Sequence, residues 1–304
     1  MKMYDIGIVG GGAAGMTAAV YGQRAGKRTI IFEGTTFGGQ IASSLHVENY
    51  PGIASISGAE FSFALLKQAK DQGAETKQAQ VIDIKEIDGV MVIQTADEKI
   101  SCKTVIIASG VTPRKLGIPK ERELIGAGVS YCATCDGAFF RGLDVAVNGG
   151  GNTALEDAEF LSNYCNRVYL IHRRDAFRGE ESLVEVLRGK ENVEFVLNST
   201  IKEIVGETEV TGLVLVNKET EAESTIDVSG VFVAIGQVPD NERFGGIVSL
   251  DSYGFVLSAE DCMTSHPQIF AAGDCRTKEV RQLTTAAADG AVAALAACKY
   301  LAFR

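Results

Sequence analysis

Two cysteines three positions apart are the residues of this sequence that most clearly carry chemistry. Cys132 and Cys135 form a Cys-x-x-Cys pair, and Asp136 follows directly. Such a pair closes and opens a disulfide with little backbone movement, and one of its thiols often has a lowered pKa that suits it to thiol–disulfide exchange. A neighbouring carboxyl group can shuttle the proton that thiolate chemistry requires. The spacing therefore predicts a redox-active dithiol with Asp136 as its acid–base group.

Two other interpretations of the cysteine pair are less favoured. A zinc site needs further ligands, but the sequence has no second Cys-x-x-Cys and only three histidines, so we expect no metal. A buried, chemically inert pair is the other alternative. The remaining cysteines stand singly and are expected to be small buried hydrophobes: Cys102, Cys165, Cys262, Cys275 and Cys298.

A glycine-rich motif near the N-terminus is typical of a site for a nucleotide pyrophosphate. Gly10-x-Gly12-x-x-Gly15 follows an apolar segment and opens residues 13–24, whose apolar spacing predicts a helix. The first glycine makes a tight turn, the second lets the backbone approach a pyrophosphate, and the third lets helix and strand pack closely. Glu33 ends the next apolar segment, where a carboxylate would accept hydrogen bonds from ribose hydroxyls. The alternative is a packing turn without a ligand, but strand, helix and acidic residue in register favour a nucleotide.

The same motif occurs a second time, with alanine at its third position. Residues 6–15 match residues 145–154, and the second copy contains Gly149-x-Gly151-x-x-Ala154. Each copy is an apolar strand, a glycine turn, helix-forming sequence and another strand. The sequence therefore predicts two βαβ units, each with a site for a pyrophosphate at the N-terminus of its helix.

The strand after the second motif ends in basic residues instead of an acid. His172, Arg173 and Arg174 stand there, and Arg178 follows. An acid at this place favours a free ribose 2′-hydroxyl, whereas arginines accommodate a 2′-phosphate. We therefore expect NADPH to bind in preference to NADH. His172 alone would be structural, but within this loop it is a candidate contact to the phosphate. The alternative is a solvated basic face.

Length and composition limit the classes of protein. At roughly 150 residues per domain, the 304 residues suggest about two domains. The net charge of −10 argues against a general binder of nucleic acids or anionic membranes. No apolar run approaches the ~18–20 residues that span a bilayer, and no signal-peptide segment precedes the first glycine motif. We therefore expect no nucleic acid, no membrane and a cytoplasmic location.

A second internal similarity indicates how the domains are connected. Residues 105–110 resemble residues 231–236, and each run ends in glycine and is followed by a proline, Pro113 or Pro239. The polar stretches there are candidate linkers, and they bracket the second glycine motif. We expect an α/β fold of two Rossmann-like, three-layer ββα domains, one inserted into the other. The outer domain would be residues 1–112 and 243–304, and the inner one residues 113–242.

Taken together, these motifs resemble the low-molecular-weight thioredoxin reductases of the pyridine nucleotide-disulfide oxidoreductases. The resemblance covers essentially the whole chain, and the combination and order of the motifs are more specific than any one of them. Its carriers are Gly10-x-Gly12-x-x-Gly15, Gly38-Gly39-Gln40, Glu48-Asn49-Tyr50-Pro51-Gly52, Cys132-Ala133-Thr134-Cys135-Asp136-Gly137, Gly149-Gly150-Gly151-Asn152-Thr153-Ala154, His172-Arg173-Arg174-x-x-x-Arg178 and Ala271-Ala272-Gly273-Asp274.

The resemblance implies that the outer domain binds FAD and that the inner domain, with its basic loop, binds NADPH. The candidate residues for FAD are Gly10, Gly12, Ala13, Ala14, Gly15, Glu33, Gly38, Gly39, Gln40, Asn49, Val81, Gly110, Gly273, Asp274, Arg281, Gln282 and Leu283. The candidates for NADPH are Gly149, Gly151, Asn152, Thr153, Ala154, His172, Arg173, Arg174, Arg178, Ile235 and Gly236.

The resemblance also implies a reaction and an assembly. Electrons would pass from NADPH to FAD, then to a Cys132–Cys135 disulfide, and from the dithiol to oxidised thioredoxin. Cys135 would be the thiol near the flavin, Cys132 would attack the partner's disulfide, and Asp136 would donate the proton. A homodimer is expected. The alternatives are a related reductase with another donor (ferredoxin or flavodoxin) or another protein disulfide as acceptor. A flavin-binding sensor without turnover is less favoured, because both cysteines and Asp136 are intact.

Overall fold

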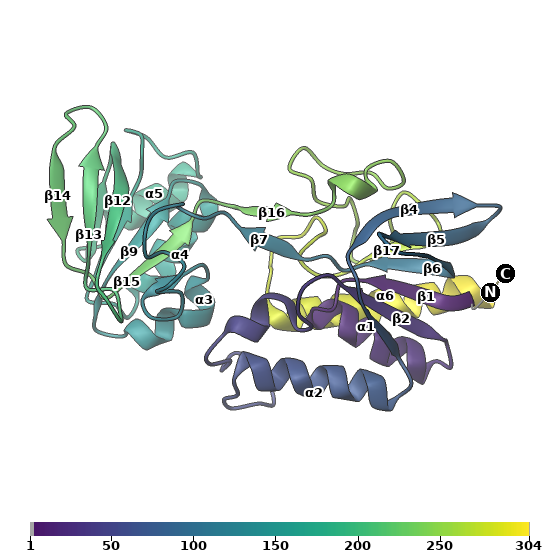
Figure 1. Cartoon of the computed structure of the whole chain (residues 1–304). Helices are drawn as coiled ribbons and strands as arrows, with labels where there is room; N and C mark the ends of the chain where they lie inside the picture. The colour runs from purple at the N-terminus through teal and green to yellow at the C-terminus, as the bar shows by residue number, and fades with distance from the viewer. Residues whose placement is uncertain (1–2, 304) are drawn as a thin grey trace. The chain divides into compact units, whose positions relative to one another are not determined.

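The computed structural model describes residues 3–303, and the chain divides into two compact units (Figure 1). One unit consists of Met1–Thr112 and Val238–Arg304, and the other is Pro113–Gln237. The second unit is therefore inserted into the first. Its C-terminal boundary falls between residues 237 and 238, a few residues before the 242/243 boundary expected from the sequence.

Two short strands carry the chain between the units. β7 (Val111–Pro113) leads out of the first unit, and β16 (Gln237–Pro239) leads back into it. The two strands pair with each other as a two-stranded ribbon. The prolines of the two expected linkers, Pro113 and Pro239, are the last residues of these strands.

A parallel sheet forms the centre of the first unit. Its strand order is β3-β2-β1-β6, and β17 continues it beside the C-terminal half of β6. These strands are β1 (Met3–Val9), β2 (Thr29–Glu33), β3 (Glu75–Gln78), β6 (Lys99–Ile107) and β17 (Ile269–Ala271). Two antiparallel strands, β4 (Val81–Ile87) and β5 (Val90–Thr95), join the N-terminal half of β6.

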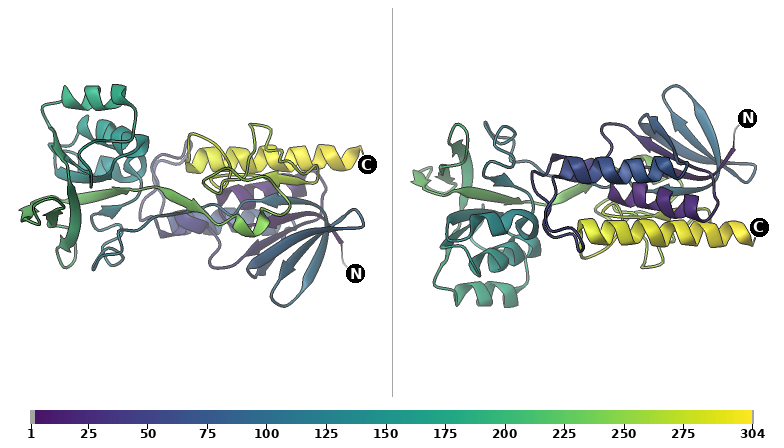
Figure 2. Two further views of the ribbon diagram at one scale, coloured as in Figure 1. Left: turned by 90° about the horizontal axis from the view of Figure 1, so that it is seen from above. Right: turned by 90° about the horizontal axis from the view of Figure 1, so that it is seen from below.

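Both faces of this sheet are covered, which gives the three layers expected. The helices α1 (Ala13–Arg24), α2 (Gly58–Asp71) and α6 (Leu283–Ala302) lie on one face, next to one another when the molecule is viewed from below (Figure 2). On the other face, apolar residues of β4 and β5 pack against β6. Because both faces are buried, the strands carry apolar residues on both sides instead of an alternating pattern.

The second unit repeats this plan. Its parallel sheet has the order β11-β10-β9-β15-β8, and helices cover one of its faces while an antiparallel sheet β12-β13-β14 covers the other. The parallel strands are β8 (Val129–Ser130), β9 (Asp144–Gly149), β10 (Arg167–Ile171), β11 (Val193–Val196) and β15 (Gly230–Ala234). The helices are α3 (Ala133–Asp136), α4 (Asn152–Ser162) and α5 (Glu181–Arg188), and the antiparallel strands are β12 (Ser199–Val205), β13 (Gly212–Asn217) and β14 (Glu223–Ile226). The predicted fold class, two Rossmann-like α/β units, is confirmed.

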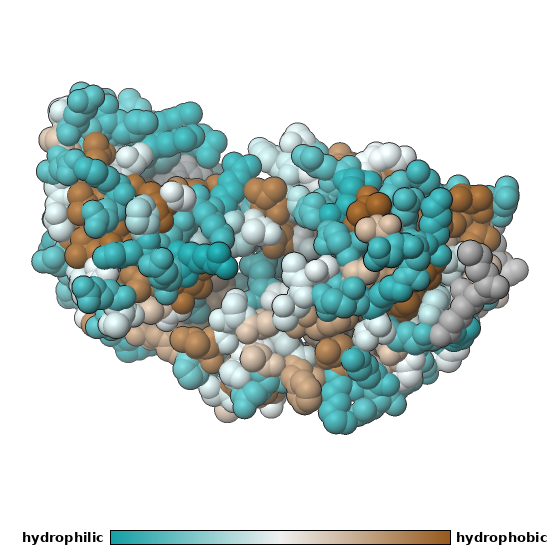
Figure 3. All heavy atoms as spheres, in the orientation of Figure 1, coloured by the Kyte–Doolittle hydropathy of each residue, from teal (hydrophilic) through white to brown (hydrophobic). Residues whose placement is uncertain are grey.

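Short 3-10 helices complete the described part of the chain: η1 (Gly39–Ser43), η2 (Gly137–Phe140) and η3 (Glu242–Phe244). Within residues 3–303, no helix has both the length and the apolar character needed to cross a membrane. Hydrophilic side chains cover most of the face drawn in Figure 3, and smaller apolar areas lie between them.

Candidate functional site

Cys132 and Cys135 form a disulfide at the start of a short helix. Their Cα atoms are 5.3 Å apart. Cys132 caps α3, and the amide of Cys135 donates to the carbonyl oxygen of Cys132 at 3.2 Å, so one helical turn holds the two side chains together. Cys135 is exposed and Cys132 is half-buried. The disulfide that the Cys-x-x-Cys spacing predicts is therefore present, and it lies in the inserted unit.

Asp136 belongs to the same helical turn. Its amide donates to the carbonyl oxygen of Cys132 at 3.1 Å, and its Oδ2 accepts from the hydroxyl of Ser130 at 2.6 Å. Burial raises the pKa of Asp136 because desolvation penalises the carboxylate, while the hydrogen bond from Ser130 partly opposes the rise. A carboxyl group with a raised pKa directly after a redox disulfide is suited to exchanging a proton with it.

The other cysteines are free thiols. Burial raises the pKa of Cys165 to about 11 and the pKa values of Cys102 and Cys262 to about 12. These thiols therefore stay protonated near neutral pH and are poor nucleophiles. Among the residues that the structure describes, no group of three or more His, Cys, Asp or Glu side chains is placed to hold a metal ion.

The first glycine turn leaves free space in front of α1. Gly10 has a φ of +112°, which favours glycine, and a Cβ on Gly15 would lie 1.9 Å from the carbonyl oxygen of Gly10. By contrast, a Cβ on Gly12, which caps α1, would meet nothing closer than 3.9 Å. Gly10 and Gly15 thus serve close packing, whereas Gly12 leaves an open approach to Ala13 and Ala14 in the first helical turn.

Glu33 ends β2 against this turn. Its Oε2 accepts from the amide of Gly11 at 2.8 Å, and its Oε1 accepts from the amide of Thr35 at 2.8 Å. Gly38 lies against this turn from a second glycine turn, because it forms a bridge with Gly12 and its amide donates to the carbonyl oxygen of Gly11 at 2.8 Å. A carboxylate and two glycine turns thus meet at the N-terminus of α1.

Other residues predicted for the same site are joined by hydrogen bonds across the loops of the first unit. Gln40 Nε2 donates to the carbonyl oxygen of Val111 at 2.7 Å, and Asn49 Nδ2 donates to Gln282 Oε1 at 3.4 Å. Gln282 caps α6, whose first residue is Leu283. The remaining candidates are Gly39 in η1, Val81 at the start of β4, Gly110 between β6 and β7, and Arg281 before α6.

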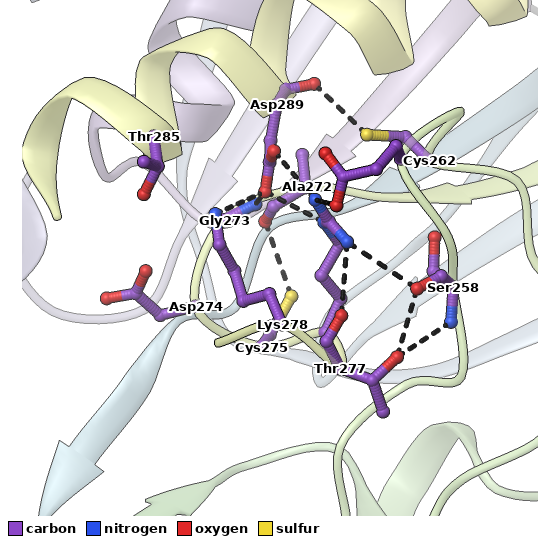
Figure 4. A network of polar contacts seen from close by, with 12 residues as sticks. Ser258, Cys262, Ala272, Gly273, Asp274, Cys275, Thr277, Lys278, Thr285 and Asp289 are labelled. Carbon is purple, nitrogen blue, oxygen red and sulfur yellow. Dashed lines mark hydrogen bonds and ion pairs between the residues drawn. The ribbon is translucent and has the colours of Figure 1, made fainter. Parts of the chain in front are cut away.

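A buried ion-pair network holds the turn that precedes α6. The amide of Gly273, whose φ is +81°, donates to Oδ2 of Asp289 on α6 at 2.9 Å. Arg276 donates to both carboxylate oxygens of Asp289, at 2.8 and 2.9 Å, and Lys278 Nζ lies 2.9 Å from Oδ2. In Figure 4, dashed lines converge on the carboxyl group of Asp289. The network therefore ties residues 273–278 to the helix.

The carboxyl group of Asp274 lies beside this network and outside its hydrogen bonds (Figure 4). Its Oδ1 is buried and has no hydrogen-bond partner within the described residues, and burial raises the pKa of Asp274. Arg281 Nε donates to the carbonyl oxygen of Asp274 at 3.3 Å. A buried oxygen without a partner costs free energy, so Asp274 Oδ1 is an acceptor available to a hydroxyl group of a ligand.

In the second glycine turn, as in the first, one glycine is needed for close packing and another leaves free space. A Cβ on Gly149 would lie 2.4 Å from the carbonyl oxygen of Ala234 and 2.6 Å from the Cβ of Ala154. A Cβ on Gly151, which caps α4, would meet nothing within 4 Å. The start of α4, with Asn152 and Thr153 in its first turn, therefore also faces free space.

Two further sets of predicted residues flank this turn. The side chain of Asn152 is held by Glu180, whose amide donates to Asn152 Oδ1 at 2.8 Å and whose Oε1 accepts from Asn152 Nδ2 at 3.1 Å. Ile235 and Gly236 follow β15, and the carbonyl oxygen of Gly236 accepts from the amide of Arg114 at 2.9 Å.

His172 differs from the arginines that follow it. Its ring is buried, stacks on Phe177 at a centroid distance of 5.3 Å, and packs so closely under Gly150 that a Cβ there would lie 2.1 Å from it. Burial lowers the pKa of His172, and its Nε2 has no hydrogen-bond partner among the described residues. The ring therefore stabilises the glycine turn by packing against Gly150.

Arg173, Arg174 and Arg178 are exposed at the C-terminal end of β10. Within the described part of the chain, no hydrogen bond or ion pair engages their guanidinium groups. Two other exposed arginines of this unit are paired: Arg167 lies 3.4 Å from Glu194, and Arg188 lies 3.1 Å from Glu181. The three unpaired cations are thus available to an anion near the second glycine turn.

Known proteins are similar to this chain over nearly its whole length. Residues 4–290 match the family described as Pyridine nucleotide-disulphide oxidoreductase. The thioredoxin reductase of Listeria monocytogenes serovar 1/2a is 41% identical over 99% of this chain and 94% of that protein. The chain belongs to the pyridine nucleotide-disulphide oxidoreductase family.

Two further relatives support this membership. The bifunctional thioredoxin reductase/thioredoxin of Mycobacterium leprae is 41% identical over 99% of this chain and 66% of that protein. A crystal structure of thioredoxin reductase from Streptococcus pyogenes MGAS5005 has a TM-score of 0.95 and 37% sequence identity, and the match covers 99% of both chains.

Members of this family generally bind a flavin and a pyridine nucleotide, and the residues present fit such groups. The free space at Gly12 and Gly151 would accept a pyrophosphate at each of two helix N-termini. The buried, unpartnered Oδ1 of Asp274 would accept a hydrogen bond from a ligand hydroxyl. The chain therefore contains two cradles of the kind that dinucleotides occupy.

Sequence reasoning missed several residues that hold these sites in place. Ser130 carries no signal of its own, because a serine two positions before a cysteine is unremarkable by type. Arg276 and Lys278 stand in a polar loop like many other cations. Asp289 did carry a signal, since it is a single carboxylate within the alanine-rich α6, and a charge at such a place calls for a partner.

Proposed function

We propose that this protein is an NADPH-dependent thioredoxin-disulfide reductase whose outer unit binds FAD and whose inserted unit binds NADPH. The observation that carries the proposal is the Cys132–Cys135 disulfide with Asp136 in the same helical turn, in a unit that also contains a glycine turn at the N-terminus of α4. The relatives named thioredoxin reductase, at 41% identity over nearly the whole chain, support it.

The outer unit would hold FAD through the features at α1 and α6. The turn at Gly12 would take the pyrophosphate, Glu33 the adenosine ribose, and Asp274 Oδ1 a hydroxyl group of the ribityl chain. The backbone amide of Gln282 donates to Thr285 Oγ1, so at the N-terminus of α6 the amide of Leu283 would be contributed to the cofactor. A flavin held there would supply two-electron chemistry between a bound NADPH and the cysteine pair.

The inserted unit would hold NADPH at the second glycine turn. Gly151 leaves room for the pyrophosphate, and the unpaired guanidinium groups of Arg173, Arg174 and Arg178 suit the 2′-phosphate. NADH lacks that phosphate and would leave the three cations without a counter-charge. This difference supports NADPH as the donor.

The cysteine pair would then reduce thioredoxin by thiol–disulfide exchange. Cys132, as a thiolate, attacks one sulfur of the thioredoxin disulfide, and the other thioredoxin sulfur leaves as a thiolate that takes up a proton. Cys135 next attacks the sulfur of Cys132, releases the second thioredoxin thiol and closes the Cys132–Cys135 disulfide again. Two electrons and two protons pass to thioredoxin, and Asp136 accepts and returns the protons in transit.

The proposal also includes the cellular compartment, the oligomeric state and the protein partner. Five free thiols fit a reducing compartment such as the cytoplasm. The family resemblance implies a homodimer. Thioredoxin is supported as the partner by the relative from Mycobacterium leprae, whose name describes a reductase and a thioredoxin in one protein.

An anaerobic titration of the purified, flavin-loaded protein tests the donor and the acceptor in turn. NADPH is expected to bleach the flavin absorbance, NADH to do so far more weakly, and an oxidised bacterial thioredoxin to restore the colour. Bleaching by neither nucleotide would overturn NADPH as donor and direct attention to ferredoxin or flavodoxin. Bleaching that thioredoxin does not reverse would overturn thioredoxin as acceptor.

A further inference from the structure

Ser130 links the backbone of Cys132 to the carboxyl group of Asp136. It is the last residue of β8, is only 4% exposed, and is held in register by pairing with Phe232 of β15. Its hydroxyl donates to Asp136 Oδ2 at 2.6 Å and accepts from the amide of Cys132 at 3.1 Å. The carbonyl oxygen of Cys132 lies 3.4 Å from the same hydroxyl. One fixed side chain thus touches both the acid and the first cysteine.

We propose that Ser130 is a positioning residue that holds the Asp136 carboxyl against the turn of the cysteine pair and sets the pH range in which Asp136 exchanges its proton. The proposal deepens the proposed function and rests on it, because the exchange matters only if the pair turns over. Ser130 itself forms no bond to the reacting sulfur atoms in this role.

The hydroxyl can serve both protonation states of Asp136. While Asp136 is a carboxylate, the Ser130 O–H donates to Oδ2, because a carboxylate oxygen can only accept and the two oxygens lie 2.6 Å apart. When Asp136 is protonated, its own O–H can donate to Ser130 Oγ, and the Ser130 O–H can turn to the carbonyl oxygen of Cys132. The first arrangement is the stronger one, because a hydrogen bond to a charged acceptor is shorter and more favourable. Ser130 therefore holds back the rise in pKa that burial imposes on Asp136.

Other titratable groups lie near α3 and could influence the proton of Asp136. The elements packed most closely on α3 are η2 and α4. The titratable and charged groups on these elements or directly after them are Arg141, Glu156, Asp157, Glu159 and Tyr164. Burial and the Ser130 hydrogen bond are the two causes of the shift at Asp136, and no charge from this set contributes. Ser130 is therefore the partner whose removal is expected to change the titration.

The direct test is a titration of the Asp136 carboxyl group in the disulfide form of the holoprotein, where neither Cys132 nor Cys135 titrates. Infrared difference spectra against Asp136→Asn identify the carboxyl band. In Ser130→Ala the midpoint is expected to rise by about one pH unit, the size expected for losing a hydrogen bond to a charged group. Ser130→Thr keeps the hydroxyl and should restore a midpoint near that of the unaltered protein.

Two further variants separate this role from a general loss of structure. Ser199→Ala removes another buried serine hydroxyl of the same unit, one that donates to a backbone carbonyl, and should leave the midpoint unchanged. Ser130→Gly removes the hydroxyl in a second way and should shift the midpoint like Ser130→Ala. An unshifted midpoint in folded Ser130→Ala or Ser130→Gly would overturn the proposal.

Turnover with thioredoxin provides the second readout. The limb of the pH profile that depends on Asp136 should move upward in Ser130→Ala, and in an Asp136→Asn background Ser130→Ala should cause no further shift. A uniform loss of rate without a shift would mean a purely structural role. If the unaltered protein failed to reduce thioredoxin while the infrared midpoint still moved, the proposed function would fail and the link between Ser130 and Asp136 would stand.

Discussion

Arg276 forms a bidentate ion pair with Asp289, with Nε 2.8 Å from Oδ2 and Nη2 2.9 Å from Oδ1. The guanidinium side chain is 2% exposed and the carboxylate 8% exposed. Lys278 reaches the same carboxylate, and the amide of Gly273 donates to it. One aspartate thus compensates two buried cations and also fixes the turn beside Asp274.

Asp289→Ala is therefore expected to destabilise the protein strongly. Removing one partner of a buried ion pair leaves an uncompensated charge and typically costs about 3–5 kcal/mol. Urea unfolding of the holoprotein measures the loss, and flavin release should occur at lower urea. Glu260→Gln is the matched control, because Glu260 also lies near Arg276, at 3.4 Å, but is 95% exposed. Equal losses in the two variants would contradict this account.

Each cysteine of the disulfide is expected to be required for turnover, and for a different reason. Cys135→Ser should lose thioredoxin reduction by on the order of a thousandfold or more, because no disulfide can form to receive electrons. It should also trap a mixed disulfide between Cys132 and thioredoxin, which mass spectrometry detects. Cys165→Ser removes a buried free thiol of the same unit and should retain activity. Trapping by Cys132→Ser in place of Cys135→Ser would reverse the roles of the two cysteines.

The unpaired arginines are expected to control the choice of nucleotide. Arg173→Gln and Arg174→Gln should each raise the KM for NADPH by about tenfold, the effect of losing one charged hydrogen bond to a phosphate, and should leave the weaker reaction with NADH nearly unchanged. Steady-state rates with both nucleotides measure the difference. Arg167→Gln is the comparison, since Arg167 is the first residue of β10, the strand that precedes these arginines, and pairs with Glu194. A parallel loss with NADH would indicate a structural effect.

Alanine substitutions at two glycines of the second turn are expected to have different effects, one on NADPH binding and the other on thermal stability. At Gly151 an added methyl group meets no protein atom within 4 Å, so Gly151→Ala should keep the thermal stability while weakening NADPH binding by filling the approach to the pyrophosphate. At Gly149 the methyl group would lie 2.4 Å from the carbonyl oxygen of Ala234, so Gly149→Ala should lower the melting temperature. Calorimetry and nucleotide titration of both variants test the contrast. Unimpaired NADPH binding by Gly151→Ala would show that the pyrophosphate does not bind at Gly151.

Local patterns in the sequence were sufficient to predict several elements. The helix expected over residues 13–24 is α1 with the same bounds, because apolar spacing and a preceding glycine turn are properties of neighbouring residues. The Cys132–Cys135 pairing was predictable for the same reason, since one helical turn brings residues three apart together. The internal repeat likewise predicted two α/β units before any long-range contact was known.

The surroundings of the functional groups were harder to predict from the sequence. The sequence grouped His172 with three arginines, whereas the structure buries its ring beneath Gly150 and leaves the arginines exposed. Adjacent residues at the end of a strand can point in different directions, and which one is buried depends on packing from other elements. Their roles toward a nucleotide stay predictions.

Chemistry and local geometry were therefore determined by the sequence itself: a dithiol with an adjacent acid, two glycine turns, and a basic strand end. Only the tertiary structure decided the partners of buried charges, such as Asp289 with Arg276 and Asp136 with Ser130. The physical reason is that a buried polar group must find its hydrogen bonds wherever the fold brings them, and those partners are set by the packing of helices and strands instead of by spacing along the chain.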